Sequence, residues 1–191
     1  MRTAHAYHDG VSDDDRDRWD RRYASLPAVT PENICLPVVF QPFSHLFPTA
    51  GTAWDLACGR ARAAIWLAQR GMTVSGYDVS PVAVAEARLL ARRCGCAART
   101  RFAVADLDDG LPPGDPVDVV LCLNFRDPRL DEPVQSRVRR GGLLAISALS
   151  EVGAGPGRYR AAPGELARAF DALDVLACGE ADGQAWLLAR R

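Results

Sequence analysis

The chain has 191 residues, of which 48% are hydrophobic, and its 23 basic and 24 acidic residues give a formal net charge of −1. This length suits one domain with a sizeable core, and the balanced charge argues against binding nucleic acid through bulk positive charge. Every basic residue is arginine, which excludes chemistry that requires a lysine, such as Schiff-base formation or a Walker lysine.

The sequence contains no sign of a membrane anchor or a metal site. Its longest apolar runs, such as Val119 to Leu123, are far shorter than the roughly 20 residues of a membrane span, and the N-terminus has no apolar signal core. The cysteines lack zinc spacing, because Cys94-Gly95-Cys96 has no second pair. We therefore expect a cytoplasmic protein with no metal and no membrane partner. Richness in Ala, Gly, Asp and Arg suggests a bacterial source with a GC-rich genome.

Residues 1–50 are expected to form a helical extension that acts as a lid. A helix is predicted from Ser12 to Ala24, because Ser12 and Asp15 resemble a capping box. Trp19 and Tyr23 are four residues apart and therefore share one face of this helix.

A proline-containing linker follows this helix. Pro42 forbids one long helix through the next segment, so we expect a turn or two of helix after it. Phe40, Phe43 and Phe47 are the expected buried side chains of this segment.

Residues 51–191 are expected to form the main domain, because strand-like and helix-like segments alternate along them. The expected strands are Thr52–Leu56, Thr73–Tyr77, Arg101–Val104, Val117–Leu123 and Leu143–Leu149. The expected helices are Ala61–Arg70, Pro81–Arg93, Asp131–Val138 and Pro163–Phe170.

The end of the chain reads as a hairpin. Leu173–Cys178 and Ala185–Ala189 flank Asp182-Gly183, a pair that favours a tight turn. The predicted fold is α/β and Rossmann-like, with a seven-stranded, mostly parallel sheet, an antiparallel C-terminal strand and helices on both faces. A nicotinamide-binding Rossmann domain does not normally end in such a hairpin.

A strand, a glycine turn and a helix between Thr52 and Arg70 form the most informative stretch. Asp78 follows Gly59 by nineteen residues and ends the second strand. This arrangement offers a nucleotide-like ligand a helix N-terminus and a carboxylate for its ribose hydroxyls. The stretch therefore predicts a cofactor site.

From about Thr52 onward the chain resembles the class I S-adenosylmethionine-dependent methyltransferases, most closely the small bacterial group around the tellurite-resistance methyltransferases. Asp55–Arg62 looks like their first motif, whose usual form in this group is D-x-A-C-G-x-G-R, and Gly76–Pro81 matches their second-strand motif. Later segments that support the resemblance are Ala105–Leu107, Val117–Asp118 and Arg139–Leu144.

Two features depart from the family pattern. Ala61 stands where the family usually has glycine. Pro112, Pro113 and Pro116 interrupt the region after the third strand, so we expect a loop there in place of a helix.

The resemblance implies S-adenosylmethionine as the cofactor. It places Asp55 near the methionine ammonium, Asp78 at the ribose hydroxyls, and Asp106 and Leu107 at the adenine. Structural interpretations remain open. They are a helix-capping acid for Asp55, a turn glycine for Gly59, an exposed loop acid for Asp78 and a solvated loop for Asp106 and Leu107. The full set of implied cofactor-binding residues is Asp55, Ala57, Cys58, Gly59, Arg60, Asp78, Val79, Asp106, Leu107 and Asn124.

Four residues are candidates for contact with the methyl acceptor. Trp19 and Tyr23 are expected to form a lid over the cofactor, or else to pack the helix onto the core. Phe125 and Arg126 follow the fourth strand, at the edge where ligands bind in such sheets. Arg126 is interpreted either as a partner for an anionic acceptor or as a surface residue that pairs with Asp127.

The sequence therefore favours methyl transfer to a small molecule. Asn124-Phe125-Arg126-Asp127 differs from the Asn-Pro-Pro-aromatic motif of enzymes that methylate DNA amino groups, so we do not expect a nucleic-acid substrate. No catalytic base is indicated, since positioning and exclusion of water supply most of the rate of methyl transfer.

Two other functions remain open. An NAD(P)-dependent oxidoreductase would need a fuller G-x-G-x-x-G, whereas the chain has Ala57, Gly59 and Arg62 at these positions. The second alternative is a non-catalytic module that binds S-adenosylmethionine.

Overall fold

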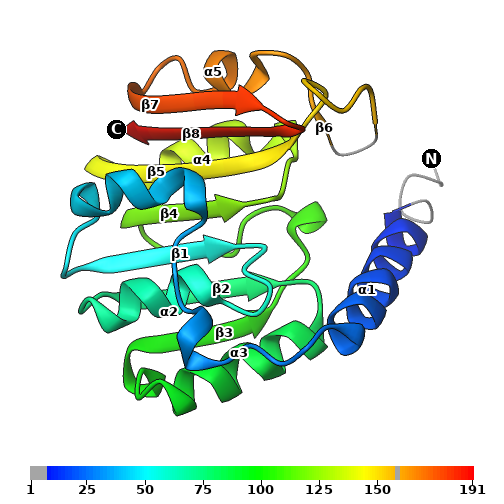
Figure 1. Cartoon of the computed structure of the whole chain (residues 1–191), viewed down its shortest axis with the longest axis vertical. Helices are drawn as coiled ribbons and strands as arrows, with labels where there is room; N and C mark the ends of the chain where they lie inside the picture. Colours follow the sequence, from blue (N-terminus) through cyan, green and yellow to red (C-terminus); the bar gives the residue numbers. More distant parts are fainter. Residues whose placement is uncertain (1–7, 158–159) are drawn as a thin grey trace.

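The computed structural model describes residues 8–157 and 160–191, which are built around one central sheet (Figure 1). The strands are β1 (Thr52–Leu56), β2 (Thr73–Asp78), β3 (Thr100–Val104), β4 (Val117–Leu123), β5 (Val138–Ser150), β6 (Arg160–Ala161), β7 (Asp174–Ala181) and β8 (Gln184–Arg190). The α-helices are α1 (His8–Ser25), α2 (Arg62–Gln69), α3 (Pro81–Arg93), α4 (Asp131–Arg137) and α5 (Glu165–Ala169). Short 3₁₀ helices are η1 (Pro31–Asn33), η2 (Val38–Leu46), η3 (Ala97–Arg99), η4 (Leu107–Asp109) and η5 (Pro128–Leu130).

The strand order confirms the predicted fold class. The strands lie in the order β3-β2-β1-β4-β5-β8-β7, and the short β6 pairs with β5 outside this order. The pairings from β3 to β5 are all parallel, whereas β8 runs antiparallel to both β5 and β7. The predicted turn of the hairpin is also confirmed, because Asp182 and Gly183 adopt φ of +51° and +76°, as such a two-residue turn requires.

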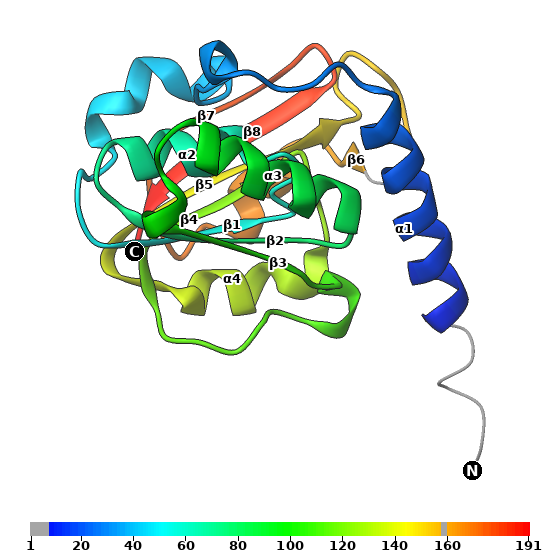
Figure 2. The same ribbon diagram turned by 90° about the horizontal axis from the view of Figure 1, so that it is seen from below.

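Helices cover both faces of the sheet, as predicted (Figure 2). On one face, α2, α3 and η2 pack on the sheet around a core that includes Ile65, Leu67 and Phe40. On the other face, α4 and α5 pack around Val134 and Phe170. The segment after β3 contains no helix longer than η4, which confirms the loop predicted from its prolines.

The N-terminal segment differs from the prediction in two places. The first helix begins at His8, so Ser12 lies inside it and the predicted capping box is wrong. The second short helix, η2, begins at Val38 and contains Pro42, whereas we predicted helix only after this proline. Complete burial of Phe40 and near-complete burial of Phe47 anchor η2 to the core, so tertiary packing outweighs the local effect of the proline.

The α1 helix lies apart from this core. It sits at the edge of the sheet where the parallel strands end, and its N-terminal half points away from the domain (Figure 2). Its stacked pair Trp19 and Tyr23, with ring centroids 5.7 Å apart, confirms that these two residues share one face.

Ala61 occupies a strained position at the start of α2. It is the N-cap residue and has left-handed φ and ψ of 60° and 33°, a conformation that favours glycine. The methyl group of Ala61 is nevertheless buried in the core. Alanine in place of the family's glycine therefore costs backbone strain and gains burial of a methyl group.

We predict that Ala61→Gly is at least about 1 kcal/mol less destabilising than Ala64→Gly. Both changes remove a buried methyl group, but glycine relieves strain at position 61 and weakens the helix at position 64. Urea unfolding of the two variants measures the difference. Equal losses of stability would show that the left-handed conformation of Ala61 carries no strain.

Candidate functional site

The site is organised by a carboxylate at the end of β2. The two oxygens of Asp78 accept hydrogen bonds from the backbone amides of Gly59, at 2.7 Å, and Ser80, at 2.9 Å. The amide of Cys58 also donates to the carbonyl of Tyr77 at 2.9 Å. These bonds hold the loop between β1 and α2 against the end of β2. Burial raises the pKa of Asp78, and the two amides oppose this shift.

Asp55 lies on the neighbouring strand and is almost fully buried, with 2% of its surface exposed. Its Oδ1 atom has no hydrogen-bond partner. Burial raises the pKa of Asp55 to about 8, the negative charge of Asp78 adds to the shift, and the amide of Ala64 opposes it. A buried carboxyl with a free oxygen needs a partner, and a cation bound at this edge would supply one.

The loop between these carboxyls has an unusual backbone. Ala57, Gly59 and Ala61 have φ of 52°, 51° and 60° respectively. This repeated left-handed conformation turns the chain sharply from the strand into α2. Burial raises the pKa of the Cys58 thiol well above its usual range, so this side chain is a neutral part of the loop.

The α1 helix docks on this same loop. A Cβ added to Gly59 would lie 2.7 Å from the hydroxyl oxygen of Tyr23, so a side chain at position 59 would collide with the tyrosine. Burial is the main cause that raises the pKa of Tyr23, and the charge of Asp78 adds to it. Tyr23 is therefore a neutral, half-buried cover over the glycine.

Two further contacts fasten this end of the extension, and the sequence analysis did not identify them. Asp20 accepts a hydrogen bond from the Ser80 hydroxyl and lies 3.4 Å from the Val82 amide. Arg60 donates to the carbonyl of Pro27 at 2.5 Å and forms an ion pair with Glu86 at 3.5 Å. Neither pairing has a sequence signal, because each joins segments far apart in the chain.

The ends of β2, β3 and β4 carry the remaining candidates. Val79 is half-buried directly after β2. Asp106 caps η4 by accepting a hydrogen bond from the Asp108 amide at 2.9 Å, and Leu107 is 6% exposed. Asn124 has an exposed side chain and φ of +57°.

The side chain of Arg126 is buried and held by ion pairs. Its guanidinium forms an ion pair with both oxygens of Asp131 and another with Glu165 at 2.6 Å, and only 5% of its side chain is exposed. The suggested pairing with Asp127 does not form, because Asp127 pairs with Arg129 at 2.6 Å. The neighbouring Phe125 is half-buried and packs against the core of the face that carries α4.

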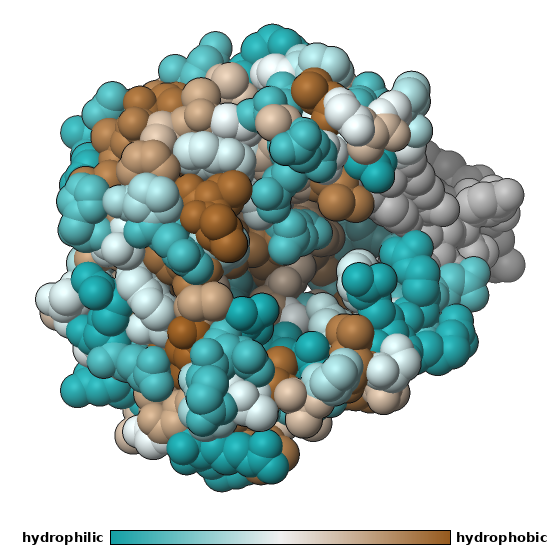
Figure 3. Space-filling model, in the orientation of Figure 1, coloured by the Kyte–Doolittle hydropathy of each residue, from teal (hydrophilic) through white to brown (hydrophobic). Residues whose placement is uncertain are grey.

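The surface is hollowed at this edge, beside the loop that follows β1 and on the side of α1 (Figure 3). The structure brings Tyr23, Gly59, Asp55 and Asp78 together where β1 and β2 end. Within residues 8–157 and 160–191, no group of three or more His, Cys, Asp or Glu side chains could hold a metal ion. In the same part of the chain, no helix is both long and apolar enough to cross a membrane.

Comparison with known proteins identifies the class. Residues 53–140 match the sequence profile of a family described as a methyltransferase domain, and this match spans both strands that carry the buried carboxyls. Residues 53–140 therefore carry a methyltransferase domain, and enzymes of this class use S-adenosylmethionine as the methyl donor. A search of curated proteins gives no match.

Solved structures share the fold at low sequence identity. Magnesium protoporphyrin IX methyltransferase (ChlM) from Synechocystis PCC 6803, with bound SAH, has a TM-score of 0.70 and 19% identity over 94% of this chain and 99% of that chain. TehB from Haemophilus influenzae has a TM-score of 0.68 and 18% identity over 92% and 66%. The [4+2]-cyclase SpnF has a TM-score of 0.64 and 18% identity over 76% of each chain. At these identities the similarity establishes the fold.

We predict that the free protein loses stability as pH rises from about 4 to about 8. The folded-state pKa of Asp55, about 8, lies above the unfolded value, so the folded state binds the extra proton and loses this advantage through that interval. Urea unfolding at pH 5 and pH 8 measures the change. Asp55→Asn should reduce it by at least about 1.4 kcal/mol, the equivalent of one pKa unit.

The matched control is Asp171→Asn, which removes an exposed carboxylate far from the site and should keep the pH dependence of the natural protein. If Asp55→Asn keeps the same pH dependence, Asp55 does not hold a proton in the folded state.

Proposed function

We propose that this protein transfers a methyl group from S-adenosylmethionine to a small-molecule acceptor at the carboxyl edge of the sheet. The observation that carries the proposal is the buried Asp55, whose Oδ1 has no partner, beside the buried Asp78 on the adjacent strand. A ligand with a cationic group and a pair of hydroxyls would satisfy both carboxyls. The methyl donor of this enzyme class has both.

We assign the cofactor-binding residues on this arrangement together with the family resemblance. Asp55 would pair with the ammonium of the methionine part, and Asp78 would accept the ribose hydroxyls while it keeps the loop in place. The left-handed loop of Ala57, Cys58, Gly59 and Arg60 would carry the backbone past the ligand. Residues assigned to the adenine end and the mouth of the site are Val79, Asp106, Leu107 and Asn124.

Methyl transfer from a sulfonium requires few catalytic groups from the protein. The cofactor supplies a sulfonium whose methyl group is already electrophilic, so the chain has to orient the acceptor and exclude water. We assign these tasks to Trp19 and Tyr23 on α1, because Tyr23 already covers Gly59. No residue is assigned as a catalytic base.

We propose a small acceptor for this site. The hollow lies between the β1 loop and α1, and Phe125 is half-buried at its strand end. The guanidinium of Arg126 is paired with two carboxylates, so we assign it a structural role beside the site and not contact with the acceptor. We also propose residues 1–50 as the extension and 51–191 as the cofactor-binding domain, with α1 as the moving part.

The alternatives receive less support. A nicotinamide-binding Rossmann sheet has the strand order 3-2-1-4-5-6, whereas here an antiparallel β8 lies between β5 and β7. A module without methyl transfer deserves a direct test, since the cyclase SpnF shares the fold.

We predict that Asp78→Asn weakens binding of both S-adenosylmethionine and S-adenosylhomocysteine by about tenfold or more. The amide keeps one oxygen, which can accept from one of the two backbone amides that Asp78 holds, but it loses the second acceptor and the charge that would hold the ribose. Calorimetry measures both affinities. Asp109→Asn, an exposed acid beyond β3, is the control and should bind as the natural protein does.

Turnover is measured as S-adenosylhomocysteine released over a panel of small oxygen, nitrogen and sulfur acceptors. Release that depends on one acceptor supports the proposal. NADH binding without S-adenosylmethionine binding would contradict it, and tight cofactor binding without transfer to any acceptor would favour the non-catalytic module.

A further inference from the structure

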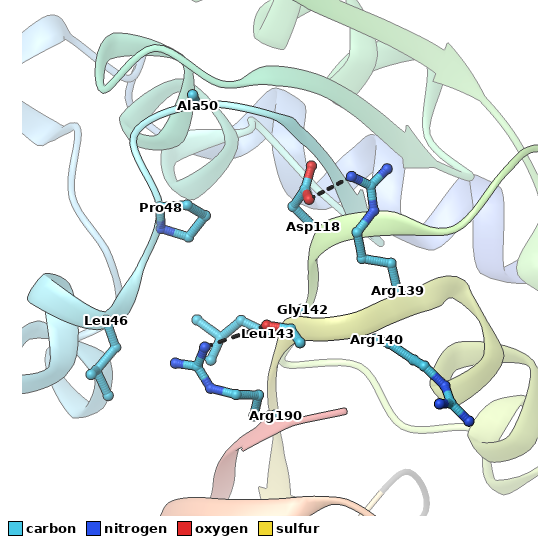
Figure 4. A pocket seen from close by; sticks show the side chains of 10 residues that line it. Leu46, Pro48, Ala50, Asp118, Arg139, Arg140, Gly142, Leu143 and Arg190 are labelled. Atoms are coloured by element: carbon cyan, nitrogen blue, oxygen red, sulfur yellow. Dashed lines mark hydrogen bonds and ion pairs between the residues drawn. The ribbon is translucent and has the colours of Figure 1, made fainter.

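A pocket lies at the opposite edge of the sheet, where β1, β4 and β5 begin (Figure 4). It has a volume of about 220 Å³. One wall is the loop before β1, and the other is the start of β5 together with Arg190 at the end of β8. No part of the proposed methyl transfer uses this pocket.

Arginine side chains dominate the polar lining. Arg139 donates to the carboxylate of Asp118 at 2.8 Å and to the carbonyl of Pro116 at 3.3 Å. Arg190 has one long contact of 3.4 Å with the carbonyl of Gly141. Each guanidinium carries five N–H donors, so most donors of these two groups remain available to a ligand.

The pocket has an excess of positive charge. Its one acidic residue, Asp118, is already engaged by Arg139 and by the amide of Thr52 at 2.7 Å. Arg140 also lines the pocket, and its guanidinium forms no hydrogen bond or ion pair with the described residues. In Figure 4 its side chain extends away from Pro48 and Leu46, so it contributes charge to the rim.

A bulge in β5 sets the positions of two of these arginines. The register of β5 against β4 shifts between Val138 and Leu143, which leaves the residues between them out of the ladder. A Cβ on Gly142 would lie 2.9 Å from the carbonyl oxygens of both Arg139 and Asp118, so only glycine fits there. The bulge is therefore a fixed support, and Arg139 on it is tied to Asp118 and to the carbonyl of Pro116.

We propose that this pocket binds the phosphate group of a small ligand. The planar fork of a guanidinium matches phosphate oxygens in pairs, and Arg190 directs its free donors between Leu46 and Leu143 (Figure 4). The volume of about 220 Å³ has room for a phosphate group with a small organic substituent. Free inorganic phosphate and a small phosphate monoester share this chemistry, and the experiment separates them.

Calorimetry on the full chain tests the proposal, with inorganic phosphate and phenyl phosphate as probes and sodium chloride at matched ionic strength as the reference. We expect saturable binding of at least one probe. Arg190→Gln should weaken it by about tenfold or more, because one charge-assisted contact is lost. Arg93→Gln, an exposed arginine of α3, is the matched control and should leave the affinity unchanged.

A second variant tests the charge argument in the opposite direction. Asp118→Asn removes the one negative charge of the pocket and keeps an acceptor for the Thr52 amide, so phosphate binding should tighten. The affinities of the two probes for the natural protein are then compared. If phenyl phosphate binds more tightly than inorganic phosphate, the ligand is a phosphate ester, and the reverse order identifies the free anion.

Equal phosphate affinity in Arg190→Gln and the natural protein would overturn the proposal, as would the absence of binding above the chloride reference. The affinity for S-adenosylhomocysteine should be the same in Arg190→Gln, because the cofactor residues lie at the other edge.

Discussion

Burial of two carboxyl groups at the ends of adjacent parallel strands is the constraint on which this structure depends. The carboxylate of Asp78 is stabilised by hydrogen bonds that it accepts from the amides of Gly59 and Ser80. These bonds hold the loop that leads into α2. Asp55 remains with an unpartnered oxygen and a pKa raised to about 8. The free protein therefore holds a proton where a cationic ligand would relieve the cost of burial.

The same loop also organises the N-terminal extension. Tyr23 lies over Gly59, and Asp20 accepts a hydrogen bond from the hydroxyl of Ser80, whose backbone amide donates to Asp78. The α1 helix and the carboxylate of Asp78 thus contact the same two residues, Gly59 and Ser80. Under the proposed function, a ligand that enters between the helix and this carboxylate would displace Tyr23 from Gly59, and movement of α1 would then be coupled to occupancy of the site.

The sequence predicted the part of the fold that local patterns encode. The bounds of β1, α3 and β4 match the prediction in full, because apolar strands and a proline in the first helical turn are local signals. The two-residue β6 and the extent of η2 were missed, since long-range packing determines both. The sequence also brought Asp55 and Asp78 to one edge, through the rule for parallel strands. It gave no indication of the Asp20–Ser80 contact or of the carboxylates around Arg126, because these partners are distant in the chain.

The most direct test of the account is calorimetry of S-adenosylhomocysteine binding at pH 6 in two buffers with different enthalpies of protonation. At this pH the amino group of the ligand is charged, and Asp55 holds its proton in the free protein. If Asp55 pairs with the ammonium, binding should release about one proton, and Asp55→Asn should abolish the release. Binding without proton release, or with equal release in Asp55→Asn, would contradict the central role given to the buried carboxyl.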